Sequence, residues 1–75
     1  MALGYVKYEV NIDFTDKLSK DFMNLLEETE QADKNNNLAA YINLVDAIDN
    51  GAKMLCSKGC INSNQWATLL NRYTF

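Results

Sequence analysis

Hydrophobic and polar residues alternate strictly near the start of the chain. One face of residues 6–14 would carry Val6, Tyr8, Val10, Ile12 and Phe14, and the other face would carry charged and amide side chains. A period of two, with β-branched and aromatic residues, is typical of a β-strand that is covered on one side. The pattern therefore predicts a strand over residues 6–14.

Apolar residues recur every three or four positions after this segment, which predicts helices. The first helix is expected to begin after a Thr15 cap and to end near Ala32. The second is expected to span residues 38–57, because its apolar register continues through Gly51. A glycine in a helix interior costs about 1 kcal/mol. A second apolar stripe with small residues would let a neighbouring helix approach closely; it consists of Ala40, Leu44, Ala47, Gly51 and Met54.

A third helix is predicted to follow a sharp turn. Gly59 is placed to end the second helix in a left-handed conformation, and Asn62 with Gln65 forms the pattern of a capping box. The predicted helical core consists of Leu18, Phe22, Leu25, Tyr41, Val45, Ile48, Leu55, Trp66, Leu69 and Leu70.

The predicted strand has no second period-two segment to pair with. Its backbone groups need hydrogen-bond partners, and residues 73–75 are too few to pair along it. We therefore expect an α+β fold of the order β-α-α-α, in a single domain of residues 1–75, with the strand paired to another chain. Its mate is either the same strand in a homodimer or the sheet edge of a target protein. The homodimer is favoured, because two copies supply helices beneath a sheet.

Composition and charge restrict the class of protein. Hydrophobic residues make up 48% of the chain and charged residues 23%, which is typical of a folded domain. A net charge of −3 disfavours binding that depends on neutralising phosphates, so nucleic acid is not the expected partner. The chain starts without a signal-peptide pattern and has no uncharged apolar run of membrane-spanning length. We expect a cytoplasmic protein that does not enter a membrane, with Cys56 and Cys60 as free thiols.

Catalysis and metal binding are not expected. The chain has no histidine, which is the usual general base near neutral pH, and no small-molecule substrate is evident. Two cysteines are too few for a structural zinc site. The run Asp33–Asn37 resembles the opening of a calcium loop, but Leu38 and Leu44 stand where that loop needs glycine and glutamate. No cofactor is predicted.

An acidic cluster lies near the end of the first predicted helix, where the helix dipole disfavours negative charge. It consists of Glu27, Glu28, Glu30 and Asp33. One interpretation is a solvated helix end. The other is a docking patch for a basic groove, such as the nucleic-acid channel of an enzyme.

Together these patterns predict a non-catalytic protein–protein interaction module, a dimeric accessory protein that acts stoichiometrically on a larger partner. One alternative is an acidic inhibitor of a host nuclease, an anti-defence protein of the anti-CRISPR type encoded by phages and mobile elements. Another is a helix-turn-helix DNA-binding regulator. Its possible base readers would be Asn62, Asn64, Gln65 and Asn71.

Overall fold

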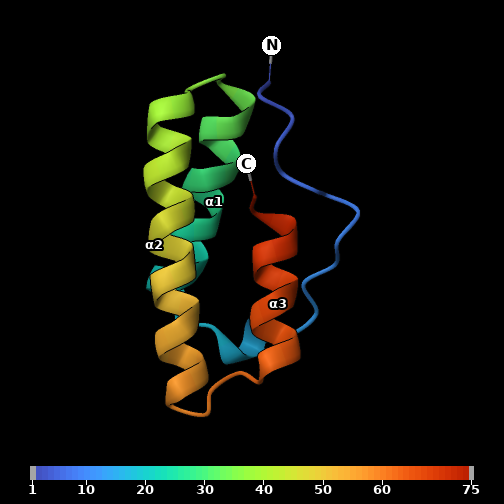
Figure 1. Cartoon of the computed structure of the whole chain (residues 1–75), viewed down its shortest axis with the longest axis vertical. Coiled ribbons are helices and arrows are strands. Elements are labelled where there is room, and N and C mark those ends of the chain that lie inside the picture. Colours follow the sequence, from blue (N-terminus) through green and yellow to red (C-terminus); the bar gives the residue numbers. More distant parts are fainter. Residues whose placement is uncertain (1, 75) are drawn as a thin grey trace.

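Three α-helices form the framework of the computed structural model, which describes residues 2–74. Helix α1 spans Lys20–Lys34, α2 spans Leu38–Ser57 and α3 spans Ser63–Arg72. A short 3-10 helix, η1, spans Thr15–Lys17. Helices α1 and α2 form an antiparallel hairpin, and α3 packs against α2 (Figure 1). The N-terminal arm, residues 2–14, runs along α3 on the side away from α2 (Figure 1).

The predicted strand and the α+β class are wrong. Residues 2–74 contain no strand, and the fold is a three-helix, all-helical arrangement. The arm makes one isolated antiparallel bridge, between Val6 and Tyr73, and the Val10 N–H then bonds back to the Lys7 carbonyl at 3.0 Å. This turn interrupts the extended conformation that the alternation predicted.

Backbone N–H and C=O groups of the arm form hydrogen bonds with other parts of the same chain. The Lys7 N–H donates to the Arg72 carbonyl at 2.8 Å, and the Arg72 side chain donates to the Tyr8 and Val10 carbonyls. A strand from another chain is therefore not required to satisfy these groups. The argument for strand pairing between two chains fails for this reason.

Helix α1 begins and ends later than the sequence predicted. Thr15 begins η1 instead of capping α1, and no side chain caps η1. The side chain of Ser19 is the N-cap of α1, and it accepts the Phe22 N–H at 3.1 Å. The helix continues past Ala32 to Lys34, whose positive charge suits a helix C-terminus.

The predicted bounds of α2 and the predicted start of α3 are confirmed. Helix α2 runs without a break from Leu38 to Ser57. Gly59 has a φ of +78°, a left-handed conformation that glycine adopts without strain. The Asn62–Gln65 capping box is present, with backbone-to-side-chain distances of 2.8 and 2.9 Å. No helix within residues 2–74 is long and apolar enough to cross a membrane.

The core lies between the helices and the arm. Of the predicted core, Leu18, Phe22, Tyr41, Val45, Ile48 and Leu69 are buried, and Leu25, Leu55, Trp66 and Leu70 are half-buried. The arm adds Val6 and Phe14, which therefore pack into the helical core of their own chain. The sequence had not placed the remaining buried apolar residues in the core; they are Leu26, Ala32, Ala52, Ile61 and Tyr73.

Candidate functional site

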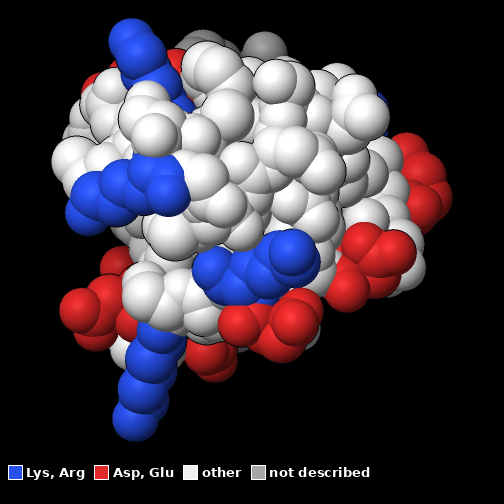
Figure 2. All heavy atoms as spheres, turned by 90° about the horizontal axis from the view of Figure 1, so that it is seen from below, with Lys and Arg blue, Asp and Glu red and all other residues white. Residues whose placement is uncertain are grey.

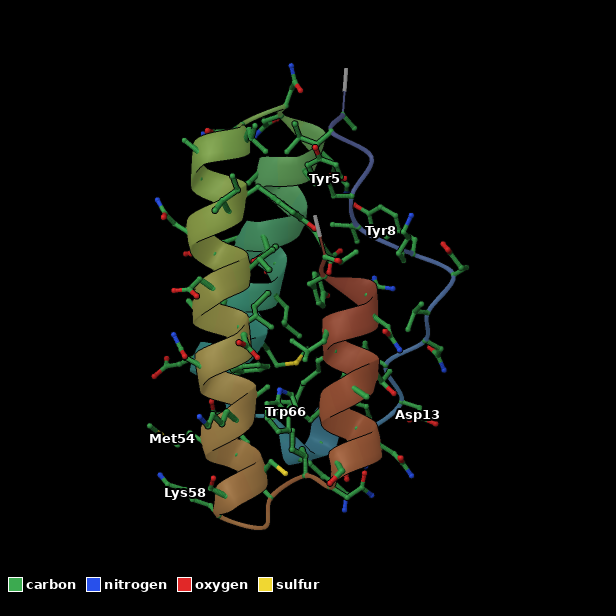
Figure 3. All side chains as sticks on the ribbon, viewed as in Figure 1. Tyr5, Tyr8, Asp13, Met54, Lys58 and Trp66 are labelled. Atoms are coloured by element: carbon green, nitrogen blue, oxygen red, sulfur yellow. The ribbon has the colours of Figure 1, made fainter. Side chains whose placement is uncertain are left out.

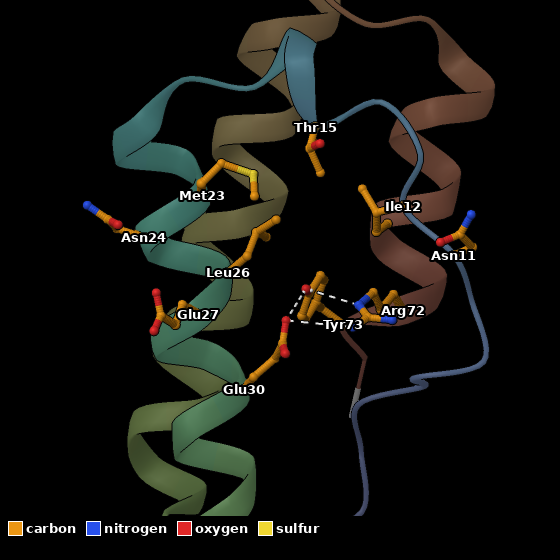
Figure 4. Close-up of a pocket in the computed structure, with 10 residues that line it drawn as sticks. All are labelled: Asn11, Ile12, Thr15, Met23, Asn24, Leu26, Glu27, Glu30, Arg72 and Tyr73. Carbon is orange, nitrogen blue, oxygen red and sulfur yellow. Dashed lines mark hydrogen bonds and ion pairs between the residues drawn. The ribbon is translucent and has the colours of Figure 1, made fainter.

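A cleft of about 340 Å³ opens between helix α1 and the arm (Figure 4). Its apolar lining comes from both sides, with Met23 and Leu26 on α1 and Ile12 on the arm. Glu27 and Glu30 stand one helical turn apart on α1, and Arg72 and Tyr73 face Glu30 from the end of α3 (Figure 4). The remaining lining residues are Asn11, Thr15 and Asn24. The cleft thus combines an apolar surface with an acidic rim.

The Arg72 guanidinium holds three parts of the molecule together. Its Nη1 donates to the carbonyl oxygens of Tyr8, at 3.1 Å, and Val10, at 2.8 Å. Its Nε donates to the Tyr73 hydroxyl at 3.1 Å, and its Nη2 lies 3.7 Å from Glu30 Oε2. Most of its donors are therefore committed to the fold.

Tyr73 completes the inner end of the cleft. Its hydroxyl donates to Glu30 Oε2 at 2.6 Å. Burial, together with the hydrogen bond to the Glu30 carboxylate, raises the pKa of Tyr73 well above its usual value. The phenol is consequently a neutral donor at physiological pH, and it fixes one oxygen of Glu30.

The structure divides the predicted acidic cluster into two pairs with different surroundings. Asp33 is only 1% exposed; its carboxylate accepts the Tyr5 N–H at 2.9 Å and its carbonyl accepts the Leu3 N–H at 2.8 Å. Asp33 thus anchors the first part of the arm, as Glu30 helps to anchor Arg72. Within residues 2–74, Arg72 with Glu30 is the one ion pair.

Glu27 and Glu28 are exposed and take no part in that ion pair. Glu27 lines the cleft, and both residues also line a shallow hollow on α1 with Asn24 and Gln31. Within the predicted acidic cluster, the negative charge available to a partner is therefore that of these two residues.

The residues predicted as a strand interface do not share one exposed face. Val6 and Phe14 are buried, and Val10 and Ile12 are half-buried. Tyr8 is 47% exposed, with its ring centroid 5.2 Å from the Arg72 guanidinium carbon, and its side chain lies on the arm side of the molecule (Figure 3).

The amides predicted to contact DNA bases are only partly free. In the capping box, the side-chain oxygens of Asn62 and Gln65 each accept the backbone N–H of the other residue. Asn64 and Asn71 are exposed. Arg72, the basic residue of α3, bonds to the arm instead of facing solvent. This arrangement does not favour the DNA-binding alternative, since phosphate contacts depend on basic side chains.

The two cysteines are both free thiols. Cys56 is half-buried and Cys60 is exposed. Among the described residues, no three Cys, Asp or Glu side chains are grouped so that they could hold a metal ion.

The sequence did not indicate the roles of Arg72, Tyr73 and Tyr5. One signal was present in retrospect: Arg72 is the single arginine of the chain and the only charged residue of α3. A lone charge beside Tyr73, at the end of an otherwise uncharged helix, is consistent with a role inside the fold. Its contacts with the arm and with Glu30 are with residues more than 40 positions away, which local patterns do not encode.

Comparison with protein-family models, with curated proteins and with solved structures finds no match to this chain. Function therefore has to be inferred from the chain itself.

Proposed function

We propose that this chain is a non-catalytic interaction module that binds a basic surface of a larger protein through the cleft between α1 and the arm. The observation that supports it is the exposed Glu27 carboxylate at the rim of an apolar cleft, outside the one ion pair of residues 2–74. A lysine or arginine side chain has an apolar stem and a charged end. Such a stem would lie on Met23, Leu26 and Ile12, and its charge would approach Glu27.

The charge of the rest of the chain supports the same kind of partner. A net charge of −3 attracts basic surfaces over distances of about 10 Å at moderate salt. The nucleic-acid channel of an enzyme is one such surface, so a stoichiometric inhibitor of a host nuclease remains the best-matched form of this function. The proposed compartment is the cytoplasm, where Cys56 and Cys60 would stay reduced.

The test compares two charge reversals of equal size. Glu27→Lys should abolish retention of the partner on immobilised protein, whereas Asp46→Lys, an exposed acid on α2, should leave retention unchanged. Retention by the unmodified protein should fall as salt is raised. A partner held equally well by the Glu27→Lys variant would refute the proposal.

Duplex DNA provides the second arm of the test. Titration with duplex DNA should show no binding under the same conditions. Salt-sensitive binding to duplex by the unmodified protein would instead support the helix-turn-helix regulator.

A further inference from the structure

A second, more apolar groove lies between the start of α1 and the end of α2. Phe22 and Leu25 line it from α1, and Met54 and Leu55 line it from α2. Its volume is about 410 Å³. Ser19, Asp21, Gly51 and Lys58 complete the lining, so the groove shares no residue with the cleft at Glu27. It is therefore a separate surface from the proposed partner site.

Gly51 accounts for the close packing of α1 on α2 beside this groove. A Cβ at Gly51 would lie 2.8 Å from the Phe22 ring, which is closer than real Cβ contacts. The absence of a side chain thus lets the ring lie against the α2 backbone. Gly51 and Phe22 both belong to the lining of the groove.

Met54 projects beside the groove that it helps to line. It is 59% exposed, the highest value among the exposed large hydrophobic residues of the described chain. Met54 and Lys58 extend from α2 on the side away from α3 (Figure 3). An unbranched, flexible thioether can fill an irregular apolar hollow. One patch therefore contains both a projecting apolar side chain and a hollow that could receive one.

The groove also carries one charge of each sign. Asp21 belongs to the first turn of α1, and Lys58 follows the last residue of α2. The two residues are not paired with each other, since the one ion pair in the part of the chain described here is Arg72 with Glu30. Charged side chains of both signs surround a broad uncharged area at the end of the molecule that carries η1 and the α2–α3 connection (Figure 2).

We propose that a second copy of this chain binds at this groove across a two-fold axis. Each Met54 would enter the groove of the other copy, and each Asp21 would face the Lys58 of the other copy. A two-fold interface uses the same patch twice, so that patch must be complementary to itself. An apolar projection, an apolar hollow and two opposite unpaired charges meet that requirement, whereas a partner of one charge sign would leave either Asp21 or Lys58 unmatched.

This dimer does not depend on the partner proposed at Glu27. It also differs from strand pairing, because both of its contact elements are helices. The buried area would be small, so the association should be weak and the dimer should dissociate on dilution.

Charge reversal tests the proposed geometry directly, with the mass measured by sedimentation velocity over a concentration series. The unmodified protein should change from monomer to dimer as concentration rises. Asp21→Lys would place lysines opposite each other and Lys58→Asp would place aspartates opposite each other, so each should weaken the dimer about tenfold or more. The double variant with both substitutions should restore it, because the opposite signs meet again.

Met54 gives an independent measurement. Met54→Ser should weaken the dimer, and Leu38→Ser, at a 44% exposed apolar residue outside the groove, should not. Helical circular dichroism of each variant verifies that the fold is retained. Glu27→Lys should leave the dimer mass unchanged, which separates this proposal from the proposed function.

Three results would overturn the dimer at this groove. The first is a monomer mass at every concentration of the unmodified protein. The second is a double charge reversal that does not restore association. The third is an equal effect of Leu38→Ser and Met54→Ser, which would place the contact on another face.

Discussion

Individual buried polar side chains connect distant parts of this small chain. The Tyr41 side chain is fully buried, and its hydroxyl donates to the Thr74 carbonyl at 2.5 Å. Its ring centroid lies 5.6 Å from that of Tyr5. One residue of α2 thus contacts both the arm and the end of the chain. The hydroxyl has a hydrogen-bond partner, so burial of this polar group is compensated.

The first prediction concerns the pH dependence of stability through Tyr41. Burial raises the pKa of Tyr41 to about 12, whereas an unfolded tyrosine titrates near its ordinary value of 10.0. Between these pH values the unfolded state loses the proton first, so the free energy of unfolding should fall as pH rises. The contribution is fully present below pH 10. Urea unfolding of the unmodified protein should show this decline.

The matched variant is Tyr41→Phe, which keeps the ring and removes the ionisable group. Its stability should be lower at neutral pH, by about 1 kcal/mol for the lost hydrogen bond. Its further decline between pH 10 and 12 should be shallower than that of the unmodified protein. Parallel declines would show that the pKa of Tyr41 does not differ between the folded and unfolded states.

Helices were the elements that sequence patterns predicted best. Their signals are local: the apolar register of α2 and the Asn62–Gln65 capping box each lie within one element. The start of α1 was missed, because Thr15 and Ser19 are both good caps and the choice depends on how η1 packs. For α1, local chemistry thus predicted that a helix forms but not where it begins.

The arm shows why alternation alone was insufficient. Its inward positions, Val6 and Phe14, are buried as a strand face would be. Whether such a segment becomes a strand depends on what its backbone groups bond to. Here the Arg72 guanidinium donates hydrogen bonds to the Tyr8 and Val10 carbonyls, and no local pattern predicts those contacts. The candidate site was missed for the same reason, since the arm forms one wall of the cleft.

The second prediction concerns the capping box of α3. Asn62→Ala removes the acceptor of the Gln65 N–H and should lower the free energy of unfolding by about 1 kcal/mol. Asn64→Ala is the control, because Asn64 is exposed and lies in the first turn of the same helix. Thermal unfolding followed by circular dichroism measures both. An equal effect of the two substitutions would mean that the box contributes little.

At the scale of the whole molecule, the arm is attached at two separate places. Near one end of the arm, Asp33 accepts hydrogen bonds from the Leu3 and Tyr5 amides. Further along, the Arg72 carbonyl accepts the Lys7 amide, and the Arg72 side chain donates to the Tyr8 and Val10 carbonyls. The cleft at Glu27 lies beside the second attachment. Local openings of folded proteins differ in free energy from region to region, so the two attachments can be tested separately.

The third prediction uses Arg72→Lys to open the second attachment alone. A lysine ammonium is a point charge and cannot reproduce the planar set of donors that reaches Tyr8, Val10 and Tyr73 together. Loss of a charged hydrogen bond of about 1.5–3 kcal/mol should raise hydrogen exchange at the Lys7 and Val10 amides about tenfold or more. The Leu3 and Tyr5 amides should keep their protection, because Asp33 still holds them.

Asp33→Ala is the complementary variant, since it removes the carboxylate acceptor of the Tyr5 amide. Exchange should then rise at Tyr5 and stay slow at Lys7. If either substitution instead exposed all four amides equally, the arm would open as one unit. The wall of the cleft would then depend on Asp33 as much as on Arg72, and binding at Glu27 should weaken in both variants. Independent opening leads to the opposite expectation, in which Arg72→Lys weakens binding of a basic partner and Asp33→Ala does not.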